Sequence, residues 1–400
     1  MPTSLQNSEP IGALRKWRVL VAHNRYQQRG GEDAVVDAEV NLLRDHGHEV
    51  IEYQRDNHDL AAMPRAKAAL QTLWSSRTTR EVGELIDQFA PDVLHVHNTF
   101  PLISPSIYWL AQRRRLPVVQ TLHNFRLICP QALMLRNDKP CEDCVGKLPW
   151  RGVAHACYRD SRLQTGLLAC AVSAHRLAGT WQHKVTRYIA LNDFCRDRFI
   201  AGGLPAEKII VKPNFVDLPA PGLQARAGFL FVGRLSIEKG IRVLVNAVRG
   251  SALQETLTVV GTGPETSLLN GVPRLQPLGA LAPAAVYAQM RQARALVLPS
   301  ICYENFPLTL VEAYACALPV IASRHGAMAS LVEDGQTGLL FEPGNSTDLA
   351  AKLEWAMDHP AEMEAMGQHA RTRYEAQLTG RANIVQLYEV YRQATSLINS

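Results

Sequence analysis

The sequence predicts an α/β protein built from two Rossmann-like, doubly wound domains that face one another. Short runs rich in β-branched residues alternate with longer amphipathic stretches, which is typical of parallel sheets covered by helices on both faces. The chain has 400 residues, of which 47% are hydrophobic and 20% charged, so it is too apolar to be disordered and long enough for two domains. The alternation is interrupted at a Pro/Gly-rich connector, residues 213–228, and then restarts.

The expected elements follow in order along each half. Strands are predicted at residues 17–22, 49–53, 92–97, 117–122 and 188–191, with helices at 32–46 and around 79–89. The second half has predicted strands at 228–232, 256–260, 295–298 and 319–322, followed by helices at 346–358, 361–377 and 381–398. We therefore expect a first domain over 1–215, a second over 228–380 and a C-terminal helix over 381–400.

Apolar length, the N-terminal segment and the charge balance exclude several classes of protein. The longest apolar stretches, such as 166–174, are shorter than the roughly 18–20 residues that cross a bilayer. The first ten residues are polar and precede the basic pair Arg15–Lys16, an order that does not fit an export signal and predicts a cytoplasmic protein. Residues 1–200 carry 26 Lys and Arg against 20 Asp and Glu, a surplus too small to indicate nucleic acid as a partner.

A glycine pair follows the first predicted strand. Gly30 and Gly31 let the backbone pass close to a ligand, and the acidic residues after them begin a helix whose free N–H groups favour an anion. A phosphate or sugar cradle and a tight turn with acidic capping both fit these residues. The dinucleotide fingerprint needs a third glycine, and Gly261-Thr262-Gly263 is also only a fragment of it, so a nicotinamide enzyme is disfavoured.

Two cations follow the first strand of the second half. Arg234 and Lys239 are five residues apart, and a guanidinium together with an ammonium is a suitable grip for a diphosphate. Pairing with Glu238 is the structural alternative.

Two carboxylates flank the start of a predicted helix. Glu304 lies in the turn after a buried strand, and Glu312 lies eight residues later, beyond Pro307, which suits a first helical turn. At that spacing the carboxylates would touch different parts of one long ligand, and the backbone N–H groups of Asn305 and Phe306 would face phosphate oxygens. For Glu312 the alternative is a helix-surface acid, although its neighbours are apolar.

Taken together in their order, these motifs resemble the family 4 retaining glycosyltransferases of the GT-B fold. The resemblance runs from about Arg18 to the last helix and rests on Gly-Gly-Glu after strand one, Gly47-His48-Glu49-Val50, residues 91–97, Thr121-Leu122-His123-Asn124, residues 233–240 and residues 304–312. It implies a donor nucleotide-sugar held mainly by the second domain, an acceptor held mainly by the first, and a last helix that crosses back to the first domain.

The resemblance also implies roles for individual residues. Arg234 and Lys239 would hold the diphosphate, Glu312 the donor ribose, and Glu304 with Asn305 and Phe306 the transferred sugar. Gly31 would approach the donor from the opposite wall, and His123 matches the family's histidine near the reacting sugar. The expected catalytic set is thus His123, Glu304, Arg234 and Lys239. The chain has no Asp-x-Asp motif, so neither a catalytic metal nor a cofactor is expected.

One segment departs from the family pattern. Residues 124–165 contain Cys129, Cys141, Cys144 and Cys157, whose spacing loosely resembles a structural zinc knot, with His155 as a competing ligand. Reduced thiols are the favoured interpretation and zinc the alternative. The region is also basic, from Arg113, Arg114 and Arg115 through Arg162, which suggests contact with an anionic membrane surface or a diphosphate-linked lipid; solvated arginines are the alternative.

The leading hypothesis is transfer of a hexose from a nucleoside diphosphate sugar to a saccharide or lipid-linked saccharide, with retention of configuration, in surface polysaccharide or glycolipid assembly. The alternatives are a nucleotide-sugar epimerase of the same architecture and a non-catalytic protein that binds carbohydrate or nucleotide. The sequence does not specify the base, the sugar or the acceptor.

Overall fold

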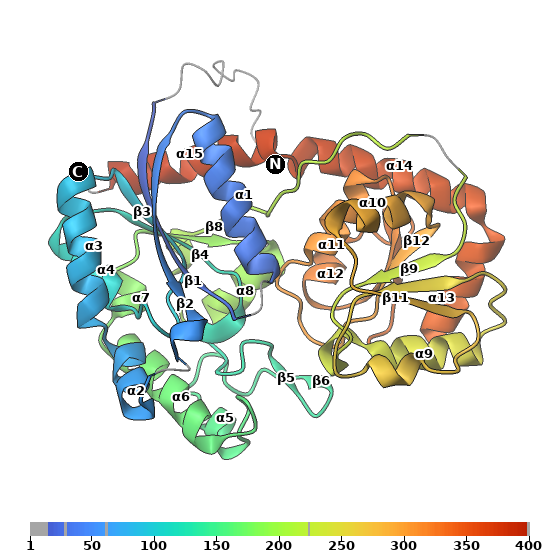
Figure 1. The fold of residues 1–400 in the computed structure, drawn as a ribbon, viewed down its shortest axis with the longest axis horizontal. Helices are drawn as coiled ribbons and strands as arrows, with labels where there is room; N and C mark the ends of the chain where they lie inside the picture. The colour runs from blue at the N-terminus through green and yellow to red at the C-terminus, as the bar shows by residue number, and fades with distance from the viewer. Residues whose placement is uncertain (1–14, 28–29, 61–62, 223–224, 398–400) are drawn as a thin grey trace.

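A computed structural model describes residues 15–27, 30–60, 63–222 and 225–397. The first ten residues, on which the prediction of no export signal depends, lie outside this set. Within it, two six-stranded sheets form the centres of two lobes that lie side by side (Figure 1). The predicted α/β class with two doubly wound domains is confirmed.

The first lobe is a parallel sheet in the order β2-β1-β3-β4-β7-β8. Its strands are β1 (Arg18–Arg25), β2 (Glu49–Asp56), β3 (Val93–Asn98), β4 (Val118–Thr121), β7 (Arg187–Ala190) and β8 (Ile209–Val211). All six residues of β3 are buried, as expected of a central parallel strand covered on both faces. The helices are α1 (Gly31–Asp45), α2 (Arg65–Leu73), α3 (Ser76–Phe89), α4 (Ser106–Arg113), α6 (Arg162–Leu177), α7 (Thr180–His183) and α8 (Asp193–Ala201).

The second lobe has the strand order β11-β10-β9-β12-β13-β14, the 3-2-1-4-5-6 order of dinucleotide-binding domains. Its strands are β9 (Phe229–Val232), β10 (Leu257–Val260), β11 (Leu275–Gly279), β12 (Ala295–Leu298), β13 (Val320–Ser323) and β14 (Gly338–Phe341). Its helices are α9 (Ile241–Gly250), α10 (Pro283–Gln292), α11 (Leu308–Ala315), α12 (Gly326–Leu331), α13 (Ser346–Asp358) and α14 (Pro360–Gln377).

In the two six-stranded sheets, the sequence analysis missed three strands: β8, β11 and β14. Each lies at an edge of its sheet and pairs with a single neighbour. β8 is only three residues long, and β11 contains Pro277, which cannot donate to a sheet ladder and belongs on edge strands.

The last helix, α15 (Gly380–Ser396), crosses back to the first lobe, as predicted (Figure 1). Ile384, Leu387 and Tyr391 share a buried hydrophobic cluster with Trp17 and Val19 of the first lobe. The helix begins at a Thr379 cap, whose side chain accepts a hydrogen bond from the Ala382 amide (3.3 Å). Burial of this apolar face attaches the end of the chain to the first sheet.

The cysteine-containing segment has little regular structure. Between a 3-10 turn (Phe125–Leu127) and the start of α6, its regular elements are the two-residue strands β5 (Leu135–Arg136) and β6 (Lys139–Pro140), which pair antiparallel, and the short helix α5 (Trp150–Ala154). The β5–β6 hairpin extends from the first lobe toward the second (Figure 1).

Candidate active site

The second lobe places Lys239 against Glu304. Lys239 ends a short 3-10 turn after β9, and Glu304 lies in the loop between β12 and α11, so both follow the carboxyl ends of neighbouring strands. Lys239 Nζ donates to Glu304 Oε1 at 2.7 Å, and the Ser300 hydroxyl donates to the same oxygen at 2.7 Å. In a parallel sheet this edge is where ligands bind.

A glycine makes this pairing possible. Gly240 has φ +72°, and a Cβ there would lie 1.8 Å from the carbonyl oxygen of Pro299. Only glycine therefore lets the loop carrying Lys239 pack directly on the loop that leads to Glu304.

The Lys239–Glu304 pair is charged. Burial by itself raises the pKa of Glu304, but the Lys239 ammonium and the Ser300 hydroxyl hold that pKa below its ordinary value. Burial likewise opposes the charge on Lys239, yet Glu304 raises the pKa of that ammonium. Because each group stabilises the charged form of the other, both charges persist at neutral pH.

Arg234 and Glu312 lie apart from this pair. Arg234 follows β9 directly and is exposed, and its guanidinium has no hydrogen-bond or ion-pair partner among the described residues. Glu312 lies in α11 and accepts a hydrogen bond from the Tyr287 hydroxyl (3.3 Å). Burial raises the pKa of Glu312, so the surface-acid alternative does not fit it. Pro307 caps α11 rather than forming its first turn.

The loop after Glu304 touches the first lobe. The Asn305 side-chain amide donates to the Leu122 carbonyl (2.7 Å), and the Asn192 side chain donates to the Asn305 carbonyl (2.6 Å). Phe306 packs against hydrophobic clusters of both lobes. A Cβ at Gly31 would lie 3.5 Å from Leu308 Cδ1, so the first residue of α1 faces the first residue of α11. The predicted residues Gly31, Glu304, Asn305 and Phe306 thus meet where the two sheets' carboxyl edges face each other.

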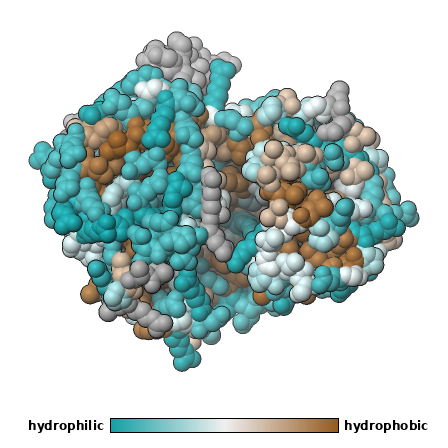
Figure 2. All heavy atoms as spheres, viewed as in Figure 1, coloured by the Kyte–Doolittle hydropathy of each residue, from teal (hydrophilic) through white to brown (hydrophobic). Residues whose placement is uncertain are grey.

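The space-filling view agrees with this arrangement. The molecular outline narrows between the two lobes, and hydrophilic side chains cover much of the visible face of the first (Figure 2).

The arginines Arg113, Arg114 and Arg115 are not part of the candidate active site, because they precede β4 and so lie at the opposite edge of the sheet from His123, which follows β4. Arg114 is paired with Asp87 (2.5 Å).

His123 is backed by a buried histidine. His123 Nε2 lies 2.9 Å from His97 Nδ1, and the two rings are stacked with centroids 5.2 Å apart. Burial lowers the pKa of both imidazoles well below the ordinary value, so both are neutral at pH 7. One nitrogen of this contact therefore donates and the other accepts.

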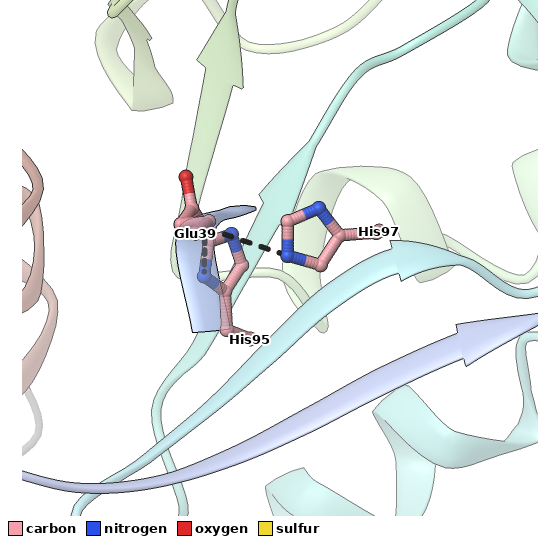
Figure 3. A group of neighbouring side chains, drawn as sticks. All are labelled: Glu39, His95 and His97. Carbon is pink, nitrogen blue, oxygen red and sulfur yellow. Dashed lines mark ion pairs between the residues drawn. The ribbon is translucent and has the colours of Figure 1, made fainter. Parts of the chain in front are cut away.

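The carboxylate behind His97 determines the direction of that hydrogen bond. Glu39 Oε1 lies 3.4 Å from His97 Nε2 and 3.2 Å from His95 Nδ1 (Figure 3). Neither contact is a hydrogen bond, because Glu39 Oε1 and His97 Nε2 both lack a hydrogen-bond partner. A nearby carboxylate still favours an N–H over a lone pair, so we assign the His97 proton to Nε2, and His97 Nδ1 then accepts from His123 Nε2–H. His123 then presents an unprotonated Nδ1, which can accept a hydrogen bond from a ligand hydroxyl.

Glu39 is neutralised by a lysine. Lys212 Nζ lies 3.0 Å from Glu39 Oε2 and 3.0 Å from Asn383 Oδ1 of α15. His95 is held from the other side by the Tyr391 hydroxyl of α15 (2.7 Å) and by Thr121 (2.8 Å). In the described part of the chain, Glu39, His95 and His97 are the one group whose possible metal-ligand atoms all lie within 4.8 Å of one another. The ammonium already supplies their counter-charge and would repel a metal ion, so we interpret the group as a hydrogen-bonded network.

Sequence reasoning did not identify Ser300, His97, Glu39 or Lys212 as site residues. The alternation His95-Val96-His97 in a buried strand was a usable signal, because histidines in such a strand need hydrogen-bond partners. Lys212 had no local signal, since its partners Glu39 and Asn383 lie more than 170 residues away in sequence.

Comparison with known proteins agrees with this geometry. The sequence model of the glycosyl transferase 4-like domain matches residues 15–214, half of the chain, and that of the glycosyl transferases group 1 matches residues 226–359. A glycogen synthase of Mycobacterium tuberculosis is 28% identical over 330 residues, covering 78% of this chain and 69% of that protein. A phosphatidyl-myo-inositol mannosyltransferase of Mycobacterium leprae is 31% identical over 237 residues, covering 54% of this chain and 63% of that protein.

Among solved structures, HepE of Anabaena in complex with UDP superimposes with a TM-score of 0.65 at 18% identity, covering 93% of this chain and 98% of that one. In the described residues no helix is both long and apolar enough to span a bilayer. Two family matches in sequence order, on two facing Rossmann-like lobes, identify the chain as a member of the GT-B, family 4-like glycosyltransferases.

Proposed function

We propose that this glycosyltransferase moves a hexose from a nucleoside diphosphate sugar to a saccharide or lipid-linked saccharide with retention of configuration. The observation that carries the proposal is the charged Lys239–Glu304 pair at the carboxyl edge of the second sheet, within one residue of the Asn305 contact to the first lobe. A cation for phosphate and a carboxylate for sugar hydroxyls lie side by side there.

The donor diphosphate would lie along Arg234 and Lys239. The exposed Arg234 guanidinium has donors to spare, as noted above, and Lys239 is 33% exposed in its side chain. Glu304 and the Asn305–Phe306 backbone would contact the transferred sugar, and Glu312 would accept from the ribose. Gly31 would face the donor from the first lobe, since it already lies against Leu308.

In the reaction, the bond between the sugar's anomeric carbon and the diphosphate oxygen breaks, and a bond from the acceptor oxygen to that carbon forms. Negative charge grows on the departing diphosphate, and the fixed charges of Arg234 and Lys239 stabilise it. The acceptor proton passes to an oxygen of the departing phosphate. Neutral His123 would orient the reacting sugar through a hydroxyl hydrogen bond at Nδ1, without adding positive charge beside the cationic sugar carbon.

A membrane-bound acceptor is supported by the surface of α5 and α6. Leu163 and Leu167 are exposed one helical turn apart in α6, and Trp150 is exposed at the start of α5. Exposed arginines, Arg151, Arg159 and Arg162, lie among them in the sequence. Apolar side chains beside basic ones suit the surface of an anionic bilayer. The M. leprae relative is named for a phosphatidyl-inositol substrate, which agrees with a lipid acceptor.

Thermal-shift measurements with a panel of UDP- and GDP-sugars test the donor proposal. A donor should raise the melting temperature in proportion to its affinity, and Arg234→Ala should abolish that shift. If no nucleotide sugar stabilises the protein, or if a donor is converted to its epimer without an acceptor, the proposal is wrong.

Cosedimentation with vesicles of phosphatidylcholine and phosphatidylglycerol tests the membrane proposal. We expect binding at low salt that the double change Leu163→Asp and Leu167→Asp removes. The matched control is Leu278→Asp, at an exposed leucine of β11 in the second lobe, which should leave binding intact. Equal loss in both variants, or no binding by the unchanged protein, contradicts membrane contact.

A further inference from the structure

Four cysteines converge on one small cavity outside the candidate active site. Cys129, Cys141, Cys144 and Cys157 come from three separate stretches of the 124–165 segment and all line a cavity of about 20 Å³. A volume of that size holds roughly one water-sized group. All four are free thiols. His155, the competing ligand considered from sequence, is exposed and does not line the cavity.

Positive charge surrounds the same cavity. Arg136 and Arg151 line it, and both lie near Asp143, at 2.8 and 3.4 Å. Four thiolates around a divalent cation carry two net negative charges, so two arginines, partly offset by one aspartate, are a suitable surrounding for such a centre.

The backbone of the segment has many residues in left-handed conformations, which a cross-link would help to hold. Of the twelve non-glycine residues with positive φ in the described chain, seven lie between residues 132 and 160. These are Ala132, Met134, Asn137, Asp138, Ala156, Arg159 and Asp160. Such conformations cost free energy and persist only where the surroundings hold them. Met134 is buried in the core of the first lobe, with Val145 and Tyr158 packed against that core, whereas Leu133, Leu148 and Trp150 are exposed.

We propose that Cys129, Cys141, Cys144 and Cys157 bind one zinc ion as a closed, structural tetrathiolate site. Zinc with four cysteines is tetrahedral and leaves no open coordination position, so the site would stabilise the segment and take no part in catalysis. No three of the four sulfurs lie within 4.8 Å of one another. Binding would draw them inward onto the ion, at the roughly 2.3 Å typical of zinc–sulfur bonds.

Zinc binding would release protons from the cysteines. Burial and the neighbouring cysteines raise the pKa of Cys144 to about 11, and burial raises the pKa of Cys129 and Cys157. Without metal these groups are thiols at neutral pH, so binding of Zn²⁺ releases their protons to solvent and weakens as the pH falls.

The site would anchor a contact between the lobes. Glu142 lies between Cys141 and Cys144; its carboxylate accepts from Arg198 (2.6 Å), and its negative charge helps burial to raise the pKa of Tyr303. Tyr303 precedes Glu304, so the Cys-x-x-Cys turn reaches the loop that carries the candidate donor-binding carboxylate. This inference stands independently of the proposed transfer reaction.

Elemental analysis of the full chain, purified without chelator under reducing conditions, tests the proposal directly. We expect one zinc per chain. Protein loaded with Co²⁺ should show the thiolate charge-transfer and visible bands of tetrahedral cobalt. The change of both Cys141 and Cys144 to Ser should abolish zinc binding and lower the melting temperature.

Cys170→Ser is the matched control, because Cys170 is an exposed thiol of α6 outside the cavity, and it should leave zinc content unchanged. If the double variant does not fold, the zinc content and cobalt spectrum of the unchanged protein still decide the question. Absence of zinc with no uptake on titration, stoichiometric iron in its place, or zinc retained without Cys141 and Cys144, overturns the proposal.

Discussion

The two lobes have similar topologies but carry their charges in different places. In the first lobe, Glu39 and Lys212 are buried behind the sheet edge, and the side chain that faces the site, His123, is neutral. In the second lobe, Arg234 and Lys239 lie at the edge itself, partly exposed. We infer that the charges of the first lobe stabilise the fold and orient His123, whereas the charges of the second lobe are available to a ligand.

The largest effect of a single substitution is expected from Lys212→Met, which should lower the free energy of unfolding by about 3–5 kcal/mol, because it leaves the Glu39 carboxylate buried without its partner. Urea unfolding followed by circular dichroism measures this. Arg44→Met is the control, since it breaks the exposed Arg44–Glu52 pair (2.9 Å) and should cost about 0–1 kcal/mol.

Adding Glu39→Gln to Lys212→Met should recover part of the lost stability, because the unpaired charge is then removed. Equal losses in Lys212→Met and Arg44→Met would show that the buried charges of the first lobe are not structural.

Arg234→Ala should lower activity and leave stability nearly unchanged, in contrast to Lys212→Met. We expect turnover, with the donor found by thermal shift, to fall by a factor on the order of 10²–10³, because one donor to the leaving diphosphate is lost. The unfolding free energy should change by no more than about 0.5 kcal/mol, since Arg234 is exposed. Arg242→Ala is the control in the same lobe, at an arginine paired with Glu265 (3.1 Å). Unchanged turnover in Arg234→Ala would remove Arg234 from the site.

This contrast also explains what the sequence could and could not predict. Arg234, Lys239, Glu304 and Gly31 were predicted as site residues because each follows a strand in a short motif, and parallel strands place such residues along one edge. The hydrogen-bonded network behind His123 was not found, because Glu39, His97, Lys212 and Tyr391 come from four distant parts of the chain. Their role depends on α15 crossing back, which is a tertiary event without a local signature.

Among the strands, too, some could be predicted from the sequence and others could not. Central strands such as β9 and β12 were predicted because they are continuously apolar. The edge strand β11 was missed because a single neighbour and partial exposure leave its sequence less constrained.

As the pH falls, protonation of the buried histidines should destabilise the first lobe before Glu39 begins to titrate. Burial lowers the pKa of His95 to about 4, against 6.5 in the unfolded chain, so the unfolded state takes up protons first and stability is lost as the pH falls. The loss should be about 1.4 kcal/mol per pH unit below 6.5 for each such histidine, including His97 and His123.

Urea unfolding at pH 6.5, 5.75 and 5 measures this effect in a window above the range where Glu39 and Glu304, whose pKa values are lowered, begin to contribute. Glu32 and Glu312, whose pKa values are raised by burial, oppose the histidines in this window. The contribution of Glu39 and Glu304 has the same sign as that of the histidines but is lost below about pH 4.5. Equal stability at pH 6.5 and pH 5 would mean that the buried histidines are not neutral in the native state.

The smallest effect is expected at His97, which we place as a positioning residue. His97→Leu removes the acceptor for His123 Nε2–H, so His123 loses its orientation, and we expect kcat to fall about tenfold while KM for the donor changes little. His97→Gln offers an amide oxygen as acceptor and should recover part of that loss, which packing alone would not predict. His175→Leu is the matched control, because His175 is buried, bonded to Thr180 (3.0 Å) and remote from the site, so it should reduce stability without lowering kcat. If Leu and Gln at position 97 give the same kcat as the unchanged protein, the network holds the fold of the first lobe but does not orient His123.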